Sequence, residues 1–565
     1  MPNIKRVSHP ILGDEAMNYE VVIKNGRIVD GTGSPWFHGD VGIKSGKIAH
    51  VGRVGTDDAD EVIDAKGLII SPGIVDIHSH SDYSILENPR VDSFIRQGIT
   101  TILNGNCGMS AAPLNEEALK GYVEMMNVKI DWLSMTDYLD KIERNGVAIN
   151  VATCTGLTNL LIMTMGYDAW DRPPSRKEVK AMGVILEQSM REGSLGLSSG
   201  LEYPPQTMTT TRDLIELSKV VAEKGGFYVT HIRSRDEQVE AAAREAIEIG
   251  ERSGASVEGV HWGARFPSDG KTKLIVDMVV AARHRGVDIG INQVPWTMDE
   301  EGVGWCGCQM IDPITSGSRY TLKGKIITAE MLRNPEVVEY LRTDLHNRQY
   351  GPILAAKRGL FDSWDRVLLA HCEKSPQYNG LNMREIGKLA RKDPFDTLID
   401  ILAAEGDGLN RVWGAVGITS LWDTEFSLLH PLSSIAIDSS NNSLEGPLSD
   451  LPVGEETTRA FGQFPYFFNK WVAEKHALGL EEAVRKCTGL PAQRMRLMDR
   501  GLIRPGMWAD IMVWSLDKIR DNSTWQKPRA YPSGISKVLV NGAVVVDENK
   551  HSGALGGKVL RRANF

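Results

Sequence analysis

The middle of the chain alternates strand-like and helical runs about eight times, and this repeat restricts the fold more than any other feature. Apolar runs such as Phe227–Ile232 are followed by stretches with helical spacing, such as Asp236–Ser253. The alternation predicts the α/β class and a parallel (β/α)8 TIM-like barrel. A doubly wound sheet is the competing fold, but no glycine-rich dinucleotide motif follows the first strand. The predicted strands are Ile74–His80, Thr100–Asn104, Asn150–Cys154, Leu195–Ser199, Phe227–Ile232, Ser256–Trp262, Asp288–Val294 and Ser434–Asp438.

Both ends of the chain have the pattern of short β-strands joined by turns. Asn25-Gly26 predicts a hairpin between Tyr19–Ile23 and Arg27–Val29, and Asn541-Gly542 predicts a similar hairpin near the other end. We therefore expect one small β-domain assembled from both termini, and 565 residues are enough for this domain and a barrel. The expected division is 1–70 plus 495–565 for the β-domain and 71–494 for the barrel.

A long insertion of about 140 residues separates the seventh and eighth predicted strands. Its first part, 296–350, is rich in glycine, proline and tryptophan, which indicates a lid-like insertion over the site. Trp296, Trp305 and Tyr320 either line an apolar binding surface or pack within the insertion. Two further apolar runs of the insertion are alternative barrel strands: Val367–His371 and Val412–Ile418.

Side chains able to bind a metal stand at the ends of five predicted barrel strands. His78 and His80 are two residues apart on a strand and therefore point to the same face. Any one of these residues alone is more often structural, but active sites of parallel barrels form at the carboxyl ends of the strands. Imidazole, thiolate and carboxylate ligands suit zinc, and six of them suit two ions that share a ligand. The six candidates are His78, His80, Cys107, His231, His261 and Asp438.

Other histidines and cysteines are weaker candidates. His371-Cys372 follows an apolar run and is the main rival ligand pair, whereas Cys306-Gly307-Cys308 is a short and less specific motif. Trp262 lies beside His261 and is expected to shape the substrate pocket. Asp438 is the expected general base, because an ionised carboxylate can accept a proton from water and return it to a leaving nitrogen.

Composition excludes several kinds of partner. The net charge is −9 and no long run has one sign, which argues against nucleic acid and anionic membranes. No apolar stretch reaches the roughly 20 residues that span a bilayer, and Met1–Met17 lacks the apolar core of a secretory signal. The six scattered cysteines do not form a disulfide framework, so a reducing, cytoplasmic location is expected. The oligomeric state stays open, and a homo-oligomer is one alternative.

Several motifs together resemble a known family. The segment 72–82, with His78 and His80, resembles the opening metal motif of the amidohydrolase superfamily. Gly105-Asn106-Cys107-Gly108 resembles the D-aminoacylase (N-acyl-D-amino-acid deacylase) family, in which a cysteine replaces the carboxylated lysine or glutamate of relatives. The resemblance extends in order through most of the chain, at 200–205, 231–234, 490–492, 499–501, 509–510, 531–532, 540–542 and 553–555.

The resemblance implies a zinc-dependent hydrolase that cleaves a non-peptide C–N amide bond in a small-molecule substrate. It also implies that the β-domain is a β-sandwich and that the insertion covers the site. The ligands of a tightly held zinc would be Cys107, His231 and His261. A second, weaker position would use His78, His80 and Asp438 and share Cys107, and Tyr203 would contact the substrate.

Two departures from the family pattern concern the substrate carboxylate. Family members usually have a lysine two positions after the sixth-strand histidine, where this chain has Gly263. They also usually have an arginine about eleven residues after the eighth-strand aspartate. The corresponding residues of this chain, 448–452, include no lysine or arginine. Arg265 and Arg319 are candidate replacements. The alternative substrate is an uncharged N-acyl amine, cyclic amide, carbamate or urea, and a remote alternative is a non-catalytic barrel scaffold.

Overall fold

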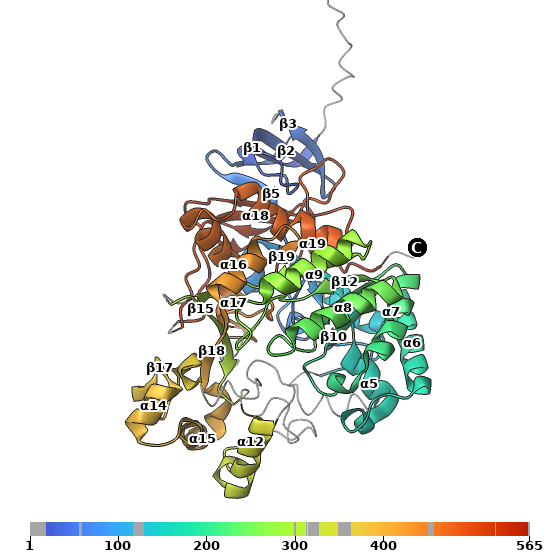
Figure 1. Cartoon of the computed structure of the whole chain (residues 1–565). Coiled ribbons are helices and arrows are strands. Elements are labelled where there is room, and N and C mark those ends of the chain that lie inside the picture. The colour runs from blue at the N-terminus through green and yellow to red at the C-terminus, as the bar shows by residue number, and fades with distance from the viewer. Residues whose placement is uncertain are drawn as a thin grey trace, which may run out of the picture.

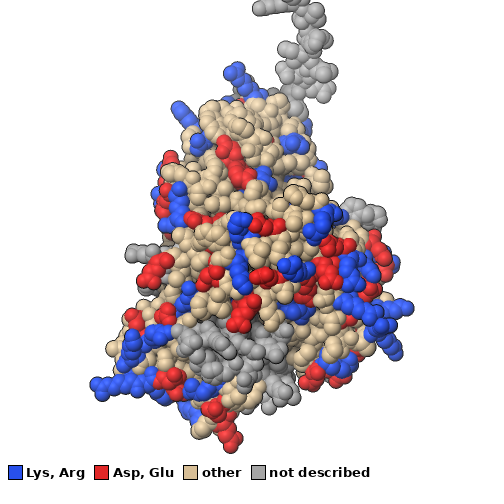
Figure 2. All heavy atoms as spheres, in the orientation of Figure 1, with Lys and Arg blue, Asp and Glu red and all other residues tan. Residues whose placement is uncertain are grey.

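The computed structural model describes most of the chain: residues 18–55, 59–116, 129–295, 297–298, 301–311, 314, 327–347, 363–449, 457–525 and 527–562. Trp296, Arg319 and Tyr320, which the sequence nominated for the insertion, lie outside these residues. Within the described ranges no helix is both long and apolar enough to cross a membrane. Acidic and basic side chains are interspersed on the face that Figure 2 shows, in line with the absence of one-sign runs.

A ring of eight parallel strands forms the centre of the described structure, so the predicted TIM-barrel core is confirmed. Its two sheets have the orders β6-β7-β8 and β9-β10-β11-β12-β13-β19, and the short β9 (Thr155–Gly156) follows β8 almost directly. A parallel bridge between Ser79 and Ser439 joins the first strand to the last. The barrel strands are β6 (Ile74–Asp76), β7 (Ile99–Asn104), β8 (Asn150–Thr153), β10 (Gly196–Gly200), β11 (Phe227–His231), β12 (Ser256–Gly259), β13 (Ile289–Gln293) and β19 (Ser433–Ile435).

Helices cover the outside of this ring (Figure 1). In α8 (Val239–Ser253) the buried residues Val239, Ala242, Ala246 and Ile249 follow helical spacing, and the helix ends at Gly254, whose φ of 75° suits glycine. Neighbouring covering helices pack against one another in chain order. They include α5 (Leu157–Met165), α6 (Arg176–Arg191), α7 (Thr211–Glu223), α9 (Thr272–His284), α16 (Leu421–Leu429), α18 (Leu480–Cys487) and α19 (Gly489–Arg494).

Strands from both ends of the chain hydrogen-bond in one nine-stranded sheet, which lies at the top of Figure 1. The two ends meet where β5 pairs with β20, with Ile70 opposite Val513. The predicted hairpin at Asn541-Gly542 is present between β21 and β22. The strands are β1 (Tyr19–Ile28), β2 (Phe37–Lys44), β3 (Lys47–Gly52), β4 (Ala59–Asp64), β5 (Ile69–Pro72), β20 (Ile511–Trp514), β21 (Ile535–Val540), β22 (Ala543–Asp547) and β23 (Lys550–His551).

The hairpin predicted at Asn25-Gly26 is wrong. The chain continues through Asn25 as the single strand β1, which pairs with β2 on both sides of an irregularity between Ile23 and Gly26. Asn25 has a φ of 60° and its backbone N–H donates to Asp40, so the dipeptide forms a bulge. Asparagine and glycine suit the left-handed backbone of a bulge as well as that of a turn, and pairing with β2 decides between them.

The insertion after β13 forms its own antiparallel sheet, with the order β14-β15-β18-β16-β17. The runs Val367–His371 and Val412–Ile418 belong to this sheet as β16 and β18 and are not barrel strands. The insertion leaves the barrel at the carboxyl end of β13 and lies at the bottom of Figure 1. Its elements include β14 (Thr297–Met298), β15 (Val303–Gln309), α12 (Pro335–Asn347), β16 (Val367–His371), β17 (Leu381–Asn382), α14 (Met383–Ala390), α15 (Pro394–Glu405) and β18 (Trp413–Ser420).

Candidate metal centre

All six nominated ligands lie at the carboxyl ends of barrel strands. His78 and His80 follow β6, Cys107 follows β7, His231 is the last residue of β11, and the remaining two, His261 and Asp438, follow β12 and β19. Backbone pairing supports the arrangement, since the Asp438 N–H donates to the carbonyl of His78 at 2.9 Å. Residues from five separate strands therefore converge, because a closed barrel brings the carboxyl ends of its strands to one rim.

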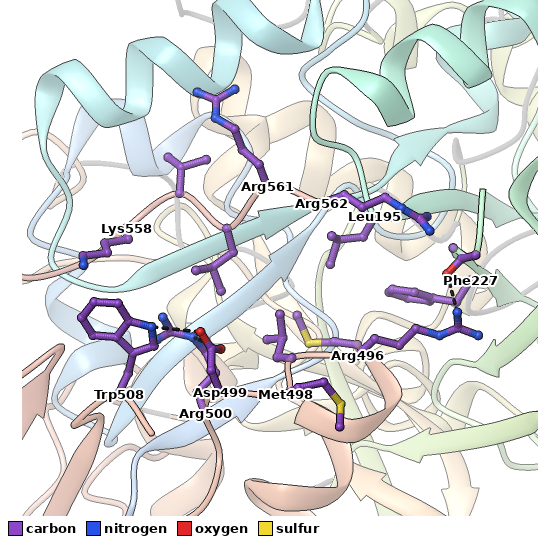
Figure 3. Close-up of a pocket in the computed structure, with 16 residues that line it drawn as sticks. Leu195, Phe227, Arg496, Met498, Asp499, Arg500, Trp508, Lys558, Arg561 and Arg562 are labelled. Atoms are coloured by element: carbon purple, nitrogen blue, oxygen red, sulfur yellow. Dashed lines mark hydrogen bonds and ion pairs between the residues drawn. The ribbon is translucent and has the colours of Figure 1, made fainter. Parts of the chain in front are cut away.

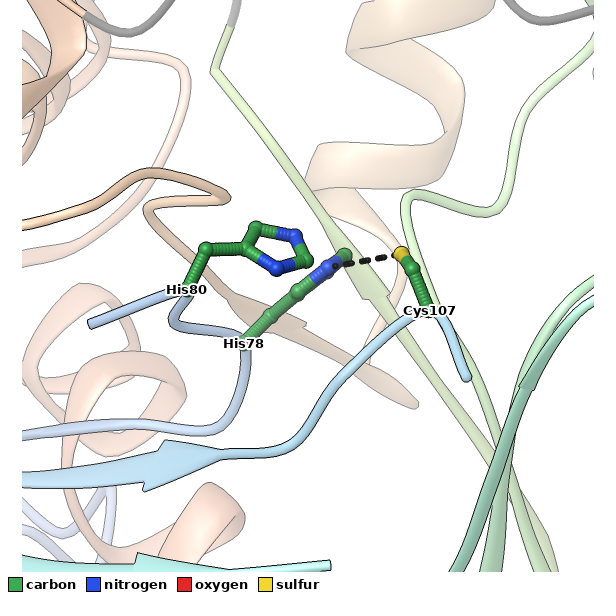
Figure 4. Close-up of side chains that lie close together, drawn as sticks. All are labelled: His78, His80 and Cys107. Carbon is green, nitrogen blue, oxygen red and sulfur yellow. Dashed lines mark hydrogen bonds between the residues drawn. The ribbon is translucent and has the colours of Figure 1, made fainter. Parts of the chain in front are cut away.

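The side chains of these residues form one compact cluster. Cys107 Sγ lies 3.3 Å from His78 Nε2 and 3.9 Å from His231 Nδ1. Asp438 Oδ1 lies 3.2 Å from His78 Nε2 and 3.3 Å from His80 Nε2. Figure 4 shows His78 and His80 on one side of this cluster, with Cys107 facing the His78 ring. The structure thus brings the two groups of ligands from the sequence prediction into contact.

Three overlapping groups have the geometry of a metal site, with potential ligand atoms within 4.8 Å of one another. They are His78/His80/Cys107, Cys107/His231/His261 and His78/His261/Asp438. Within the described ranges none of these groups includes the rival residues His371, Cys372, Cys306 or Cys308. Cys372 donates to Glu405 at 2.8 Å inside the insertion instead.

Two histidines of the cluster carry buried ring nitrogens without a hydrogen-bond partner among the described residues. Nδ1 of His78 and Nδ1 of His261 are both buried and have no hydrogen-bond partner among the described residues. Buried polar atoms without partners are rare in proteins and cost free energy. Together with the nitrogen, sulfur and oxygen donors, these atoms fit zinc, which favours imidazole, thiolate and carboxylate.

Backbone conformation also sets these residues apart. Cys107, His261 and Asp438 have φ values of 50°, 36° and 50°, in the left-handed region that residues with a side chain seldom adopt. Such a conformation costs about 1–2 kcal/mol for a non-glycine residue. Strained backbones concentrate at functional sites, because there the surrounding structure holds a side chain in one required direction.

The electrostatics of the cluster favour a thiolate. Burial raises the pKa of the Cys107 thiol, but the charge of His78 and hydrogen bonds from His231 and His261 outweigh burial and hold this pKa well below 9.0. Burial lowers the pKa of His261 to about 3, and the positive charge of Arg235 adds to this effect. A thiolate at Cys107 beside a neutral imidazole at His261 is the protonation state in which these two groups bind metal.

Glu202 is a site residue that we did not predict from the sequence. Its Oε2 lies 2.8 Å from His231 Nε2, and its Oε1 accepts a hydrogen bond of 2.6 Å from Arg265. Burial raises the pKa of the Glu202 carboxyl, but Arg265 and His231 outweigh burial and lower this pKa to about 2. The carboxylate orients His231 so that Nδ1 faces Cys107, as carboxylates commonly do behind metal-binding histidines. The sequence signal that could have identified Glu202 is its position two residues after the barrel strand β10.

Arg459 is the second residue that sequence reasoning missed. It lies on α17 (Thr457–Phe467) and its Nη1 donates to Asp438 Oδ2 at 3.1 Å. An arginine was expected about eleven residues after Asp438, whereas Arg459 follows it by 21. Burial raises the pKa of Asp438, but His78 and Arg459 outweigh burial and hold this pKa well below 3.8. A fixed spacing of about eleven residues could not find Arg459, which follows Asp438 by 21 residues.

The three nominated substrate-binding residues occupy different surroundings. The Tyr203 ring stands edge-on to His231, with 4.9 Å between ring centroids. Trp262 is 0% exposed and packs with the apolar residues beneath the helices. Arg265 is buried, and it pairs with Asp236 at 3.3 Å as well as with Glu202. Of the three, Tyr203 therefore lies directly against a metal-site histidine.

A separate cavity of about 480 Å³ lies at the opposite end of the barrel (Figure 3). Leu195 and Phe227, which line it, stand at the amino ends of β10 and β11, and the last described residues of the chain form another wall. None of the six ligand candidates lines this cavity. Barrel enzymes carry out their chemistry at the other rim, so the cluster around Cys107 is the candidate active site.

A parallel barrel with imidazole, thiolate and carboxylate groups at its carboxyl rim defines the class of metal-dependent barrel hydrolases. A sequence model described as "Amidohydrolase family" matches residues 61–291 and 455–546, which is more than half of the chain. The chain therefore belongs to the amidohydrolase family, and the resemblance read from the motifs is confirmed. It is a metal-dependent hydrolase that acts on C–N bonds other than peptide bonds.

Characterised relatives match over nearly the whole chain. N-acyl-D-glutamate deacylase of Alcaligenes xylosoxydans xylosoxydans is 28% identical over 550 residues, covering 96% of this chain and 96% of the relative. D-aminoacylase of the same organism is 25% identical over 553 residues, covering 97% and 99%. The solved N-acyl-D-glutamate deacylase of Bordetella bronchiseptica, complexed with zinc and a phosphonate inhibitor, superposes with a TM-score of 0.76 at 25% identity and covers 96% of this chain and 100% of that one.

Proposed function

We propose that this protein is a zinc-dependent deacylase that hydrolyses the amide bond of N-acyl-D-amino acids. The observation that carries the proposal is the cluster of His78, His80, Cys107, His231, His261 and Asp438 at the catalytic rim of the barrel. The relatives named N-acyl-D-glutamate deacylase and D-aminoacylase support the substrate class. The reaction consumes water and releases a carboxylic acid and a free amino acid.

We assign Cys107, His231 and His261 to one tightly held zinc, because their ligand atoms form one of the close groups and His231 is oriented by Glu202. His78, His80 and Asp438 belong to a second, weaker position that shares Cys107. Zinc held by these residues would supply Lewis-acid chemistry, lowering the pKa of a coordinated water toward about 7 and polarising the scissile carbonyl.

Asp438 is the general acid and base in the proposed reaction. Its carboxylate accepts a proton from the attacking water while the new C–O bond forms, and then donates this proton to the leaving nitrogen as the C–N bond breaks. The amine can leave because it departs protonated. Arg459 donates to Oδ2 of Asp438 and so directs the carboxylate, while Oδ1 stays near the histidines.

The pocket around the reacting bond would include Tyr203, whose ring lies against His231. Arg265 acts indirectly in this proposal, because its charge is matched by Glu202 and Asp236. Trp262 shapes the pocket from below by supporting the backbone beside His261. Substrate recognition by Tyr203 and exclusion of bulk water together favour the productive geometry.

We also propose the domain division expected from the sequence. Residues 1–70 and 495–565 form a β-sandwich domain, 71–494 form the catalytic barrel, and 296–350 act as a lid. The pairing of β5 with β20 supports the two-ended β-domain. The lid proposal is supported by the exit of the insertion at the carboxyl rim, where β15 with Trp305 begins shortly after β13.

The alternative is an uncharged amide, carbamate or urea-type substrate. Two observations favour keeping it: Gly263 has no side chain at the position where relatives place a cation, and the Arg265 charge is matched by carboxylates. The N-acyl-D-amino acid and the uncharged substrate would be hydrolysed by the same metal chemistry. The two proposals differ only in which substrate groups the pocket recognises beyond the scissile bond.

Amine release from a panel of substrates tests the proposal. Purified zinc-loaded protein is given N-acetyl-D-amino acids, their L-enantiomers and the corresponding uncharged amides. We expect hydrolysis of the D-acids that a chelator abolishes and added zinc restores. Hydrolysis of the uncharged amides alone would favour the alternative. Full zinc occupancy without hydrolysis of any substrate would refute a catalytic role.

A further inference from the structure

Arg235 is a buried arginine at the catalytic rim, and among the described residues no carboxylate forms an ion pair with its guanidinium. It follows the ligand candidate His231 by four residues and is 3% exposed. Its Nε donates to the carbonyl of Gly263 at 3.1 Å, and its backbone N–H donates to Glu202 at 3.2 Å. Its Nη2 is buried and has no hydrogen-bond partner among the described residues.

The neighbouring arginines, unlike Arg235, form ion pairs with carboxylates. Arg265 pairs with Glu202 and Asp236, and Arg459 pairs with Asp438. Arg233, two residues before Arg235, pairs with Glu245 at 2.8 Å. Within the described ranges no carboxylate lies within 4.0 Å of the Arg235 guanidinium as an ion pair. A buried charge without a counter-charge is unfavourable unless a ligand supplies one.

The guanidinium of Arg235 is close enough to the metal cluster to act on its charges. Gly263, whose carbonyl accepts from Arg235 Nε, follows His261 by two residues, and Glu202, which accepts from the Arg235 backbone N–H, lies 2.8 Å from His231. Burial and Arg265 lower the pKa of Arg235 to about 10, although the charges of Glu202, Asp438 and Tyr203 raise it, so Arg235 is charged at neutral pH. These contacts place Arg235 beside His231 and His261 at the candidate site.

We propose that Arg235 binds the α-carboxylate of the substrate through Nη2 and thereby sets the specificity for N-acyl amino acids. The α-carboxylate is three bonds from the scissile carbonyl carbon, so a cation beside His261 and Asp438 is within its reach. The carboxylate would supply the missing counter-charge and the missing acceptor at once, with the strength of a charge-assisted hydrogen bond. This inference rests on the proposed function and names the residue that selects its substrate class.

Comparing an acid with its amide tests Arg235. Arg235→Gln and Arg235→Lys are measured with an N-acetyl-D-amino acid and with its C-terminal amide, and zinc content is measured in each preparation. We expect Arg235→Gln to lower kcat/KM for the acid by about 10- to 100-fold and to change the amide little. Arg235→Lys should recover part of the loss, since it keeps a charge but not the planar donor.

Equilibrium binding gives a second readout that does not need turnover. We expect the zinc-free wild-type protein to bind the acid more tightly than the amide in calorimetry, and Arg235→Gln to remove this preference. Arg233→Gln is the matched control, because it removes an arginine from the same strand end whose charge Glu245 matches. It should keep the wild-type ratio of acid to amide.

An unchanged ratio of acid to amide in Arg235→Gln would overturn the proposal, in either readout. Equal losses on both ligands with loss of zinc would also overturn it, because they would show a purely structural role. If the wild-type protein hydrolyses no N-acyl amino acid, the proposed function fails. The binding comparison still decides whether Arg235 recognises a carboxylate, so the two failures are distinguishable.

Discussion

Replacing Glu202 with glutamine tests whether the carboxylate behind His231 supports the metal centre. Glu202 is 2% exposed, and it accepts hydrogen bonds from Arg265, from the backbone N–H of Arg235 and from His231. Glu202→Gln keeps the shape of the side chain and removes its charge, which leaves Arg265 paired with Asp236 alone.

The structure sets the size of the expected effects. Removing one partner of a buried ion pair costs about 3–5 kcal/mol, so the free energy of unfolding of the zinc-free protein should fall by about that amount. Losing the carboxylate partner of a metal-binding histidine lowers metal affinity by about 10- to 100-fold. Urea unfolding of the zinc-free protein measures the first effect, and chelator competition for zinc measures the second.

Glu245→Gln is the matched control for Glu202→Gln. Glu245 also pairs with an arginine after β11, at 2.8 Å from Arg233, but within the described part of the chain it forms no hydrogen bond or ion pair with any of the six ligand candidates. We expect it to lower stability and leave zinc affinity unchanged. Zinc affinity of Glu202→Gln equal to that of the wild type would refute the view that Glu202 orients a ligand.

Three further predictions concern the metal, the proton transfer and the pH dependence of stability. Cys107→Ala should lose bound zinc whereas Cys154→Ala, which removes another buried cysteine, should keep it; full zinc stoichiometry in Cys107→Ala would disprove the ligand assignment. Asp438→Asn should lower kcat by about 10²- to 10⁴-fold with the tightly held zinc retained, and near-wild-type turnover would exclude it as the general base. Burial raises the pKa of Asp521 from 3.8 to about 6, so its contribution of about 3 kcal/mol to stability is full below pH 3.8 and is lost as the pH rises through 6. Asp521→Asn should remove this part of the pH dependence in urea unfolding, and an unchanged pH profile would contradict the assignment.

Much of the fold follows from local patterns in the sequence. Each of the eight predicted runs overlaps a barrel strand, because short apolar segments separated by amphipathic helices have few other ways to bury their side chains. The strand ends were equally readable, since His231 lies at the end of one apolar run and Cys107 lies three residues after another. A local pattern could not separate a bulge from a hairpin at Asn25-Gly26, where the pairing with β2 decides.

The sequence by itself determined the barrel, the types of metal-binding side chain and the rim on which they stand. Only the tertiary structure decided which groups support them, because Glu202 and Arg265 meet across 63 residues and Arg459 reaches Asp438 from a separate helix. It also decided that Arg265 has its charge matched while Arg235 does not. The physical reason is that strand and helix periodicity are local properties, whereas the pairing of buried charges depends on which distant segments the closed barrel brings together.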